Sequence, residues 1–235
     1  MNEHSPAPDG NRLLAHLPAE ELALLRPHME QVQLAHGQRI ILPHVPIKDL
    51  FFPLNSLLSL VTTMEDGSSV ESGSIGREGM SGVPVLLDAV ETTMPTFVQI
   101  PGEAIRIKAS VVKEVYERGG ELKKILNRYI HTVIVVGSQS TACNRLHNIE
   151  ARLARWLLAS SDGIGSKEVN ITHEYLAVML GVRRAGVSEA AAKLQERNLI
   201  RYNRGNVTIV ERESLEMSAC ECYHAIRQEY ERLFS

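Results

Sequence analysis

Short apolar runs separated by turn-forming residues fill much of the first half of the chain. The clearest runs cover residues 39–42, 50–52 and 57–64, and Pro, Asn or Asp residues stand between them. Asp66-Gly67 has the sequence of a tight hairpin turn. Many short strands at regular spacing predict an all-β barrel or jelly roll over residues 32–109.

The residues before this region predict a tail and two short helices. Residues 1–10 are polar and contain two prolines, which is typical of a disordered tail. In residues 11–30, leucines at helical spacing lie on either side of Pro18. We therefore expect a helix pair, broken at Pro18, that covers one end of the sheet.

Beyond residue 108 the apolar spacing becomes helical. Over residues 121–146 one seam repeats at alternating intervals of four and three residues, and it consists of Leu122, Leu126, Tyr129, Val133, Val136, Ser140 and Cys143. Such a helix either lies on the barrel as part of its core or pairs with a second chain. We favour a dimerisation helix that uses the seam from Leu122 to Ser140, because about 24 helical residues would extend roughly 36 Å. Small residues such as Gly137 and Thr141 would let two helices approach closely.

A second amphipathic helix is expected over residues 149–159, which include Trp156, the only tryptophan. Residues 160–166 are mostly Ser, Gly and Asp, and this composition predicts a linker.

Residues 170–210 combine two helices, a glycine turn and a hairpin. Thr172 is a good N-cap for a helix that runs to Leu180, and Gly181 follows where the backbone must turn through a left-handed conformation. A second helix over about 183–197 is rich in alanine, and residues 199–210 form two short strands around a polar turn. This order predicts a winged helix-turn-helix, whose second helix enters the major groove of DNA. The acidic helix that follows is expected to pack against this domain.

Composition agrees with a folded protein of two domains. Of the 235 residues, 44% are hydrophobic and 23% are charged. The net charge of −3 argues at first against nucleic acid, but between residues 183 and 206 six basic residues stand against two glutamates. Positive charge is thus confined to the expected recognition helix and wing. Since neither a membrane span nor a signal peptide is recognisable, we expect a cytoplasmic protein.

The sequence resembles a known family in three segments. Residues 171–177 (ITHEYLA), 180–184 (LGVRR) and 195–200 (QERNLI) resemble the winged helix of the Crp/Fnr family of bacterial transcription regulators. The upstream order of β-roll, long helix and short helix is similar to that family as well. The resemblance implies a homodimer that binds a palindromic operator in double-stranded DNA, with RNA polymerase as a further candidate partner.

The same resemblance implies an α+β fold class with three parts. These are a cyclic-nucleotide-binding-like β-roll sensor domain over residues 11–120, a dimerisation helix over residues 121–146, and a winged helix-turn-helix DNA-binding domain over residues 147–235.

By position in the family motif, Arg184 matches an arginine that contacts guanine, and Thr172 matches a residue that contacts phosphate. The DNA-binding residues that follow are Thr172, Arg183, Arg184, Ser188, Glu189, Lys193, Arg201 and Arg204. The sequence departs from the family pattern at Ala185, where a base-reading Glu is common, and at Glu189, where an Arg is common. We therefore expect a different operator. Glu189 either accepts a hydrogen bond from cytosine or pairs with Lys193 four positions on.

A glycine-rich segment is similar to the phosphate-binding turn of the family's sensor domain, and its candidate ligand residues are Gly76, Arg77, Glu78 and Gly79. Cyclic-nucleotide-binding relatives carry a Glu for the ribose and an Arg-Ser pair for the phosphate, whereas this sequence has Arg77 and Met94-Pro95 near those positions. A buried phosphate would lack its main charge partner, which argues against cAMP. Either the glycines serve turns of the β-roll, as we prefer, or Arg77 itself holds an anion.

Three cysteines are expected to be free thiols. No cysteine precedes Cys143, which argues against an iron–sulfur sensor. Cys220, Cys222 and His224 form a C-x-C-x-H string, but positions two apart on a helix point to nearly opposite faces. We therefore predict no metal site there, and a redox role for Cys220 and Cys222 stays open.

Enzyme motifs are absent from the sequence, so we expect no enzyme. His173-Glu174 begins a zinc-protease motif, but position 177 is Ala instead of the second His ligand. The alternative function is a module that binds a cyclic nucleotide or another small molecule and does not act on DNA. The effector, the operator and the choice between activation and repression stay open.

Overall fold

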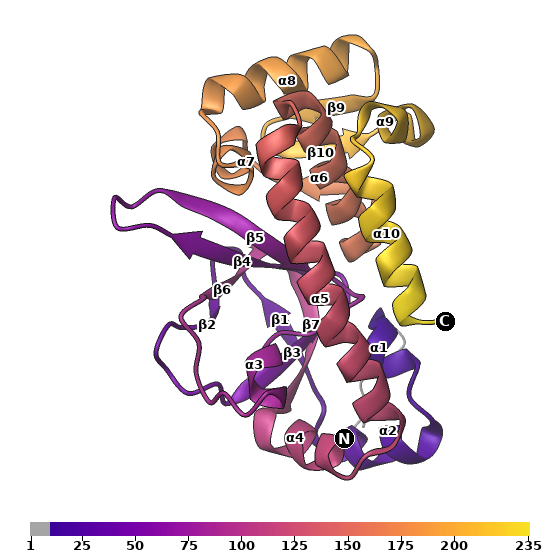
Figure 1. The fold of residues 1–235 in the computed structure, drawn as a ribbon. Coiled ribbons are helices and arrows are strands. Elements are labelled where there is room, and N and C mark those ends of the chain that lie inside the picture. The colour runs from indigo at the N-terminus through magenta and orange to yellow at the C-terminus, as the bar shows by residue number, and fades with distance from the viewer. Residues whose placement is uncertain (1–9) are drawn as a thin grey trace.

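The computed structural model describes residues 10–235, and the predicted tail over residues 1–10 lies outside them except for Gly10. A β-barrel is followed by a long helix and then by a helical domain with a small sheet (Figure 1). The expected α+β fold class is confirmed. Among the helices of this range, none is both long and apolar enough to span a membrane.

Two short helices precede the barrel, as predicted: α1 (Arg12–Ala15) and α2 (Ala19–Leu25). Asn11 begins α1, and its side-chain oxygen accepts hydrogen bonds from the backbone of the first turn. The side-chain amide of Asn11 donates to the carbonyl oxygens of Pro53 and Gly79. One buried polar side chain therefore both starts the helix and joins it to the barrel.

Seven antiparallel strands form the barrel: β1 (Glu30–Leu34), β2 (Arg39–Ile41), β3 (Asp49–Pro53), β4 (Leu57–Thr63), β5 (Ser69–Ile75), β6 (Thr96–Ile100) and β7 (Gly102–Lys108). They make two sheets, in the orders β1-β7-β3 and β2-β6-β4-β5. The hairpin predicted at Asp66-Gly67 joins β4 to β5. A short helix within the barrel region, α3 (Val83–Leu86), has no counterpart in the sequence-based expectation.

Both faces of β4 are buried, which explains why its sequence is a continuous apolar run. Leu58 belongs to the core inside the barrel, together with Ile75 and Val98. Leu57 and Val61 point to the other side and belong to the core of the C-terminal domain. The two domains thus share one strand of the sheet as a common wall.

Three helices follow the barrel: α4 (Ala109–Glu117), α5 (Gly120–Leu146) and α6 (Ile149–Ile164). The bounds of α5 agree closely with the helix expected over residues 121–146. Its N-terminal half packs into the core between barrel and helices through Leu122, Leu126 and Tyr129. The backbone leaves the helix at His147, and Asn148 caps α6.

The linker predicted over residues 160–166 is wrong, because α6 continues to Ile164. Ser160 and Ser161 are buried, and the Ser161 hydroxyl donates to the carbonyl oxygen of Ser166. Gly163 lies against Leu57 and Gly76 of the barrel. The small residues therefore allow close contact between α6 and the barrel.

The C-terminal domain contains a three-stranded sheet and four further helices: β8 (Glu168–Asn170), α7 (His173–Leu180), α8 (Arg184–Glu196), β9 (Ile200–Asn203), β10 (Asn206–Ile209), α9 (Arg212–Ser218) and α10 (Cys222–Leu233). Contrary to expectation, α10 runs mainly along α5 and reaches back to the N-terminal helices (Figure 1). Its last apolar residue, Leu233, joins the core at the base of α5.

Tyr129 offers a test of how firmly α5 is fixed to the barrel. Its hydroxyl donates to the carbonyl oxygen of Met80 at 3.0 Å and accepts from the backbone N–H of Met80 at 3.1 Å. Tyr129→Phe leaves both buried groups unsatisfied, so we expect a loss of about 1–3 kcal/mol in the free energy of unfolding, measured by urea denaturation. Tyr202→Phe is the control, since no hydrogen bond of the Tyr202 hydroxyl occurs in residues 10–235. Equal stability of Tyr129→Phe and the wild type would contradict this role.

Candidate nucleic-acid interface and adjoining sites

Helix α7, a glycine turn and helix α8 form the predicted helix-turn-helix. The Thr172 hydroxyl accepts a hydrogen bond from the backbone N–H of Tyr175 and so caps α7. Gly181 ends α7 at φ +59°, where an L side chain would be strained. A Cβ atom at this position would lie only 3.1 Å from the Val70 side chain of the barrel hairpin. The glycine thus serves the turn and the domain contact together.

The buried face of α8 fixes which residues it presents to solvent. Val187, Ala190, Ala191 and Leu194 are buried against α6 and the rest of the domain. Arg183 stands at the N-cap and Arg184 is the first helical residue, and both side chains are exposed. Arg184 forms an ion pair with Glu174 at 3.7 Å, and both partners are more than two thirds exposed. Such a pair contributes little to stability, so the arginine is free to contact DNA.

Ser188 is held in place by neighbours that sequence reasoning missed. Its hydroxyl lies 3.0 Å from Nδ1 of His173 and donates to the carbonyl oxygen of Arg184 at 3.2 Å. The His173 ring lies on Tyr202 of β9 with the ring centroids 4.2 Å apart. Burial, and secondly the charge of Arg184, lower the pKa of His173. The imidazole of His173 therefore positions the Ser188 hydroxyl at the surface of α8.

The remaining predicted DNA contacts are exposed. Glu189 and Lys193 lie on the outer face of α8 and form no ion pair with each other among the residues described. Arg201 lies on β9, and Arg204 stands at the wing tip in a left-handed conformation with φ +46°. In Figure 1, α8 and the β9–β10 wing lie at the end of the molecule opposite the N-terminal helices.

The predicted dimer seam on α5 faces its own chain. Leu122, Leu126, Tyr129 and Ser140 are buried within the same chain, Val133 packs on its core and Val136 lines a cavity. The buried members of the seam agree with the alternative of a core helix, and their pairing with a second chain stays a prediction. A neighbouring face, roughly a quarter turn around the helix, carries Ile134, Gly137 and Thr141, while Ile130 on the same row packs against the core of its own chain. Ile134 is 63% exposed.

A cavity of about 390 Å³ lies between the barrel and the helices of the C-terminal domain. Strand β5 contributes residues 71–74, and helices α5, α6 and α10 supply most of the other walls. Of the four predicted ligand residues, Arg77 and Glu78 line this cavity. Gly76 and Gly79 do not, because Gly76 packs against Gly163 and Gly79 lies against the Tyr129 hydroxyl. Those two glycines permit close contacts within the protein.

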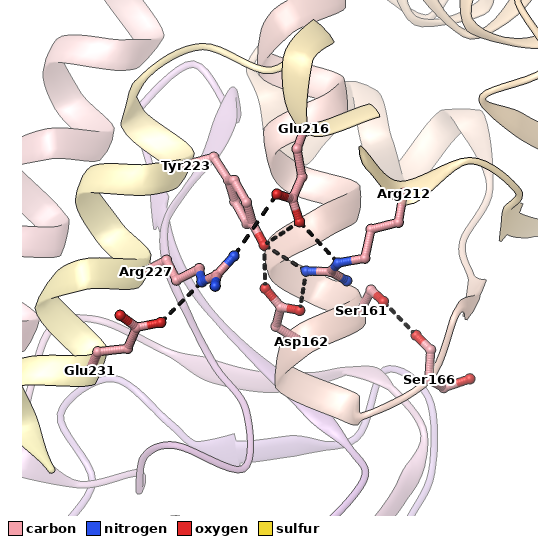
Figure 2. Close-up of polar contacts among 8 residues, drawn as sticks. All are labelled: Ser161, Asp162, Ser166, Arg212, Glu216, Tyr223, Arg227 and Glu231. Carbon is pink, nitrogen blue, oxygen red and sulfur yellow. Dashed lines mark hydrogen bonds and ion pairs between the residues drawn. The ribbon is translucent and has the colours of Figure 1, made fainter. Parts of the chain in front are cut away.

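One wall of the cavity is a network of paired charges (Figure 2). Arg212 bonds to Asp162 at 2.7 Å and to Glu216 at 3.0 Å, and the Tyr223 hydroxyl donates to Asp162 at 2.8 Å. Burial first, and the charge of Asp162 second, raise the pKa of Tyr223 to about 12. The network ties α6, α9 and α10 together, and its charges are already satisfied.

Arg155 differs from Arg212 and Arg227 in this respect. Its side chain is only 8% exposed, its Nε atom has no hydrogen-bond partner, and no ion pair of Arg155 occurs among residues 10–235. The nearby carboxylate of Glu71 accepts hydrogen bonds from the Ser59 hydroxyl at 2.8 Å and from the Trp156 indole N–H at 3.0 Å. Burial raises the pKa of Glu71. A buried guanidinium thus faces the cavity without a hydrogen bond or ion pair, and Glu71 and Cys143 act on its charge only at longer range. Such burial is costly unless a ligand supplies a direct partner.

The cysteines do not lie as the sequence predicted. Cys220 precedes α10 and follows Ala219, whose backbone is extended, so Cys220 and Cys222 are not two positions of one helix. They meet Cys143 and His147 from the end of α5, while His224 is exposed and outside the group. A hydrogen bond with the Cys220 thiol lowers the pKa of Cys143 to about 5. Cys143 and His147 stand four residues apart at the end of the helix expected over residues 121–146, and this spacing could have indicated from the sequence that their side chains lie together.

Comparisons with known proteins agree with this architecture. The family model of the Crp-like helix-turn-helix domain matches residues 151–218. No curated protein matches the sequence significantly. Among solved structures, FixK2 from Bradyrhizobium japonicum is 11% identical, with a TM-score of 0.67, over 82% of this chain and 98% of that chain.

Two further structures show the same fold. A transcriptional regulator of the CRP/FNR family from Thermus thermophilus is 19% identical, with a TM-score of 0.64, over 81% of this chain and 98% of that chain. The c-di-GMP responsive regulator CLP from Xanthomonas campestris is 13% identical, with a TM-score of 0.60, over 82% of this chain and 99% of that chain.

Proposed function

We propose that the chain, which carries a Crp-like helix-turn-helix domain and has the fold seen in Crp/Fnr transcriptional regulators, is a DNA-binding regulator that binds a palindromic operator as a homodimer. The observation that carries the proposal is the outer face of α8, which presents exposed basic and polar side chains at its N-terminal end. This is the geometry by which a recognition helix reads base edges in the major groove. We propose no enzymatic activity.

Each exposed side chain has a role in this proposal. Arg184 reads a guanine with its guanidinium, and Arg183, Ser188 and Glu189 refine the sequence preference. The phosphate contacts come from Thr172, Lys193, Arg201 and Arg204, which lie on the flanks of α8 and on the wing.

Arg184→Ala tests base recognition. We expect binding to the preferred duplex to weaken by about 1–3 kcal/mol and the preference at one base pair of each half-site to relax, measured by duplex selection and titration. Lys193→Ala is the control, because loss of a phosphate contact weakens all sequences equally and lowers the slope of log K against log salt by about one. Unchanged base preference in Arg184→Ala would refute the assignment.

The second chain is proposed to pack on the free face of α5. Ile134 is a large apolar side chain exposed in the middle of this helix, and a Cβ at Gly137 would meet no atom within 4 Å. An exposed isoleucine beside an open glycine position suits the close approach of a second helix. A two-fold axis along this face would also place the two α8 helices symmetrically.

Ile134→Arg tests this interface. A buried, unpaired charge at the helix pair disfavours association, so we expect the mass in sedimentation equilibrium to fall from two chains to one. Val90→Arg is the matched control, since Val90 is 70% exposed on the barrel and away from α5. A dimer that persists in Ile134→Arg at the same concentration would show that another surface pairs the chains.

The cavity is proposed as the effector site for an anionic small molecule. Arg155 supplies a buried, unpaired cation, and Arg77 adds a second positive charge at the wall. A carboxylate or phosphate would satisfy Arg155 by a charge-assisted hydrogen bond. The walls come from both domains, so a ligand there would alter how the domains are held together.

Arg155→Gln tests the effector proposal. Four anions are titrated at constant ionic strength: cyclic AMP, cyclic di-GMP, citrate and inorganic phosphate. We expect at least one of them to raise the melting temperature of the wild type. The same anion should leave Arg155→Gln unshifted, whereas Arg227→Gln, at a paired cavity arginine, should still respond. An equal shift in wild type and Arg155→Gln, or no shift with any of the four, would contradict the proposal.

A further inference from the structure

Three thiols and one imidazole meet where α5 ends and α10 begins. Cys143 lies in the last turns of α5, His147 follows that helix, and Cys220 and Cys222 lie at the start of α10. Their ligand atoms all lie within 4.8 Å of one another. We propose that these four residues bind one zinc ion, which fastens the C-terminal helix to the end of α5.

The distances suit a single tetrahedral ion. With Zn–S near 2.3 Å and Zn–N near 2.0–2.1 Å, neighbouring ligand atoms of a tetrahedron lie roughly 3.5–3.8 Å apart. Here the Sγ atoms of Cys143 and Cys220 are 3.5 Å apart, and Sγ of Cys222 lies 3.6 Å from Nδ1 of His147. The S···N edge therefore already has the required length, and the S···S edge is within about 0.3 Å of it.

The backbone explains why the four side chains converge. Cys143 and His147 are four residues apart and so project from one face at the end of α5. Ala219 is extended and α10 begins only at Cys222, which lets two cysteines two residues apart turn to the same point. The two pairs come from segments 77 residues apart in sequence.

Neighbouring groups orient the ligands as they do in zinc sites. Nε2 of His147 lies 3.2 Å from the carboxylate of Glu221, which would leave Nδ1 free to face the metal. The side-chain amide of Gln139 donates to Sγ of Cys222 at 3.0 Å. Three thiolates and Zn²⁺ would leave a net charge of −1, and the buried guanidinium of Arg152 acts on Cys143 and Cys220 to offset it.

A metal explains the cluster better than a disulfide does. A Cys143–Cys220 disulfide would need the sulfurs to approach to about 2.05 Å. It would also not explain why Cys222 and His147 converge on the same point. The set of three cysteines and one histidine is a closed, four-coordinate arrangement of the structural kind. The cluster is distinct from both the DNA-reading face and the Arg155 cavity, and it fixes the point at which the chain turns from α5 into α6.

The proposal is tested by the metal content of the full chain, purified under reducing conditions and desalted. We expect about one zinc per chain by elemental mass spectrometry, and less than a fifth of that in Cys220→Ser and His147→Ala. His224→Ala is the matched control and should keep the full amount, since His224 belongs to the C-x-C-x-H string but lies outside the cluster.

A second measurement does not depend on the variants folding. Addition of Co²⁺ to the metal-free wild-type chain should give the visible absorption of a tetrahedral thiolate site at one equivalent, and Zn²⁺ should displace it. A chelator should lower the melting temperature of the wild type. Metal-free protein that gives no cobalt spectrum, zinc retained in both variants, or iron in place of zinc would overturn the assignment.

Discussion

The packing of α5 is the constraint from which the rest of the molecule follows. Its N-terminal half is fixed to the barrel by buried apolar contacts and by the hydrogen bonds of Tyr129 to Met80. Along its side lies α10, and α6 leaves from its end at His147. Ile134 is exposed in the middle of this helix, and the proposed contact with a second chain uses the face around it.

The same packing joins the barrel to the C-terminal domain. Strand β4 gives one face to the barrel core and the other to the core that contains the buried face of α8. The cavity with Arg155 opens between these two parts, and the Cys143–His147–Cys220–Cys222 cluster lies at the turn from α5 to α6. A ligand or a metal at either place would therefore act on the position of the recognition helix, since no flexible linker separates them.

The sequence predicted what depends on local pattern. Residues 170–210 have caps, a glycine turn and a wing that follow from neighbouring residues, and the strands follow from short apolar runs. The sequence could not predict which face of α5 is covered, because this face is determined by contacts with α10 and the barrel, which come from distant parts of the chain. The linker at residues 160–166 was wrong because small residues serve close packing as well as turns. The meeting of Cys143, His147, Cys220 and Cys222 was missed because Ala219 breaks the helix that the C-x-C string suggested.

Hydroxyl-radical footprinting on the preferred duplex tests the central claim most directly. A dimer joined through α5 holds two copies of α8 on one side of the DNA, so we expect two protected regions about one helical turn, or roughly 34 Å, apart. A single protected region at saturating protein, or two regions without a fixed spacing, would contradict the account.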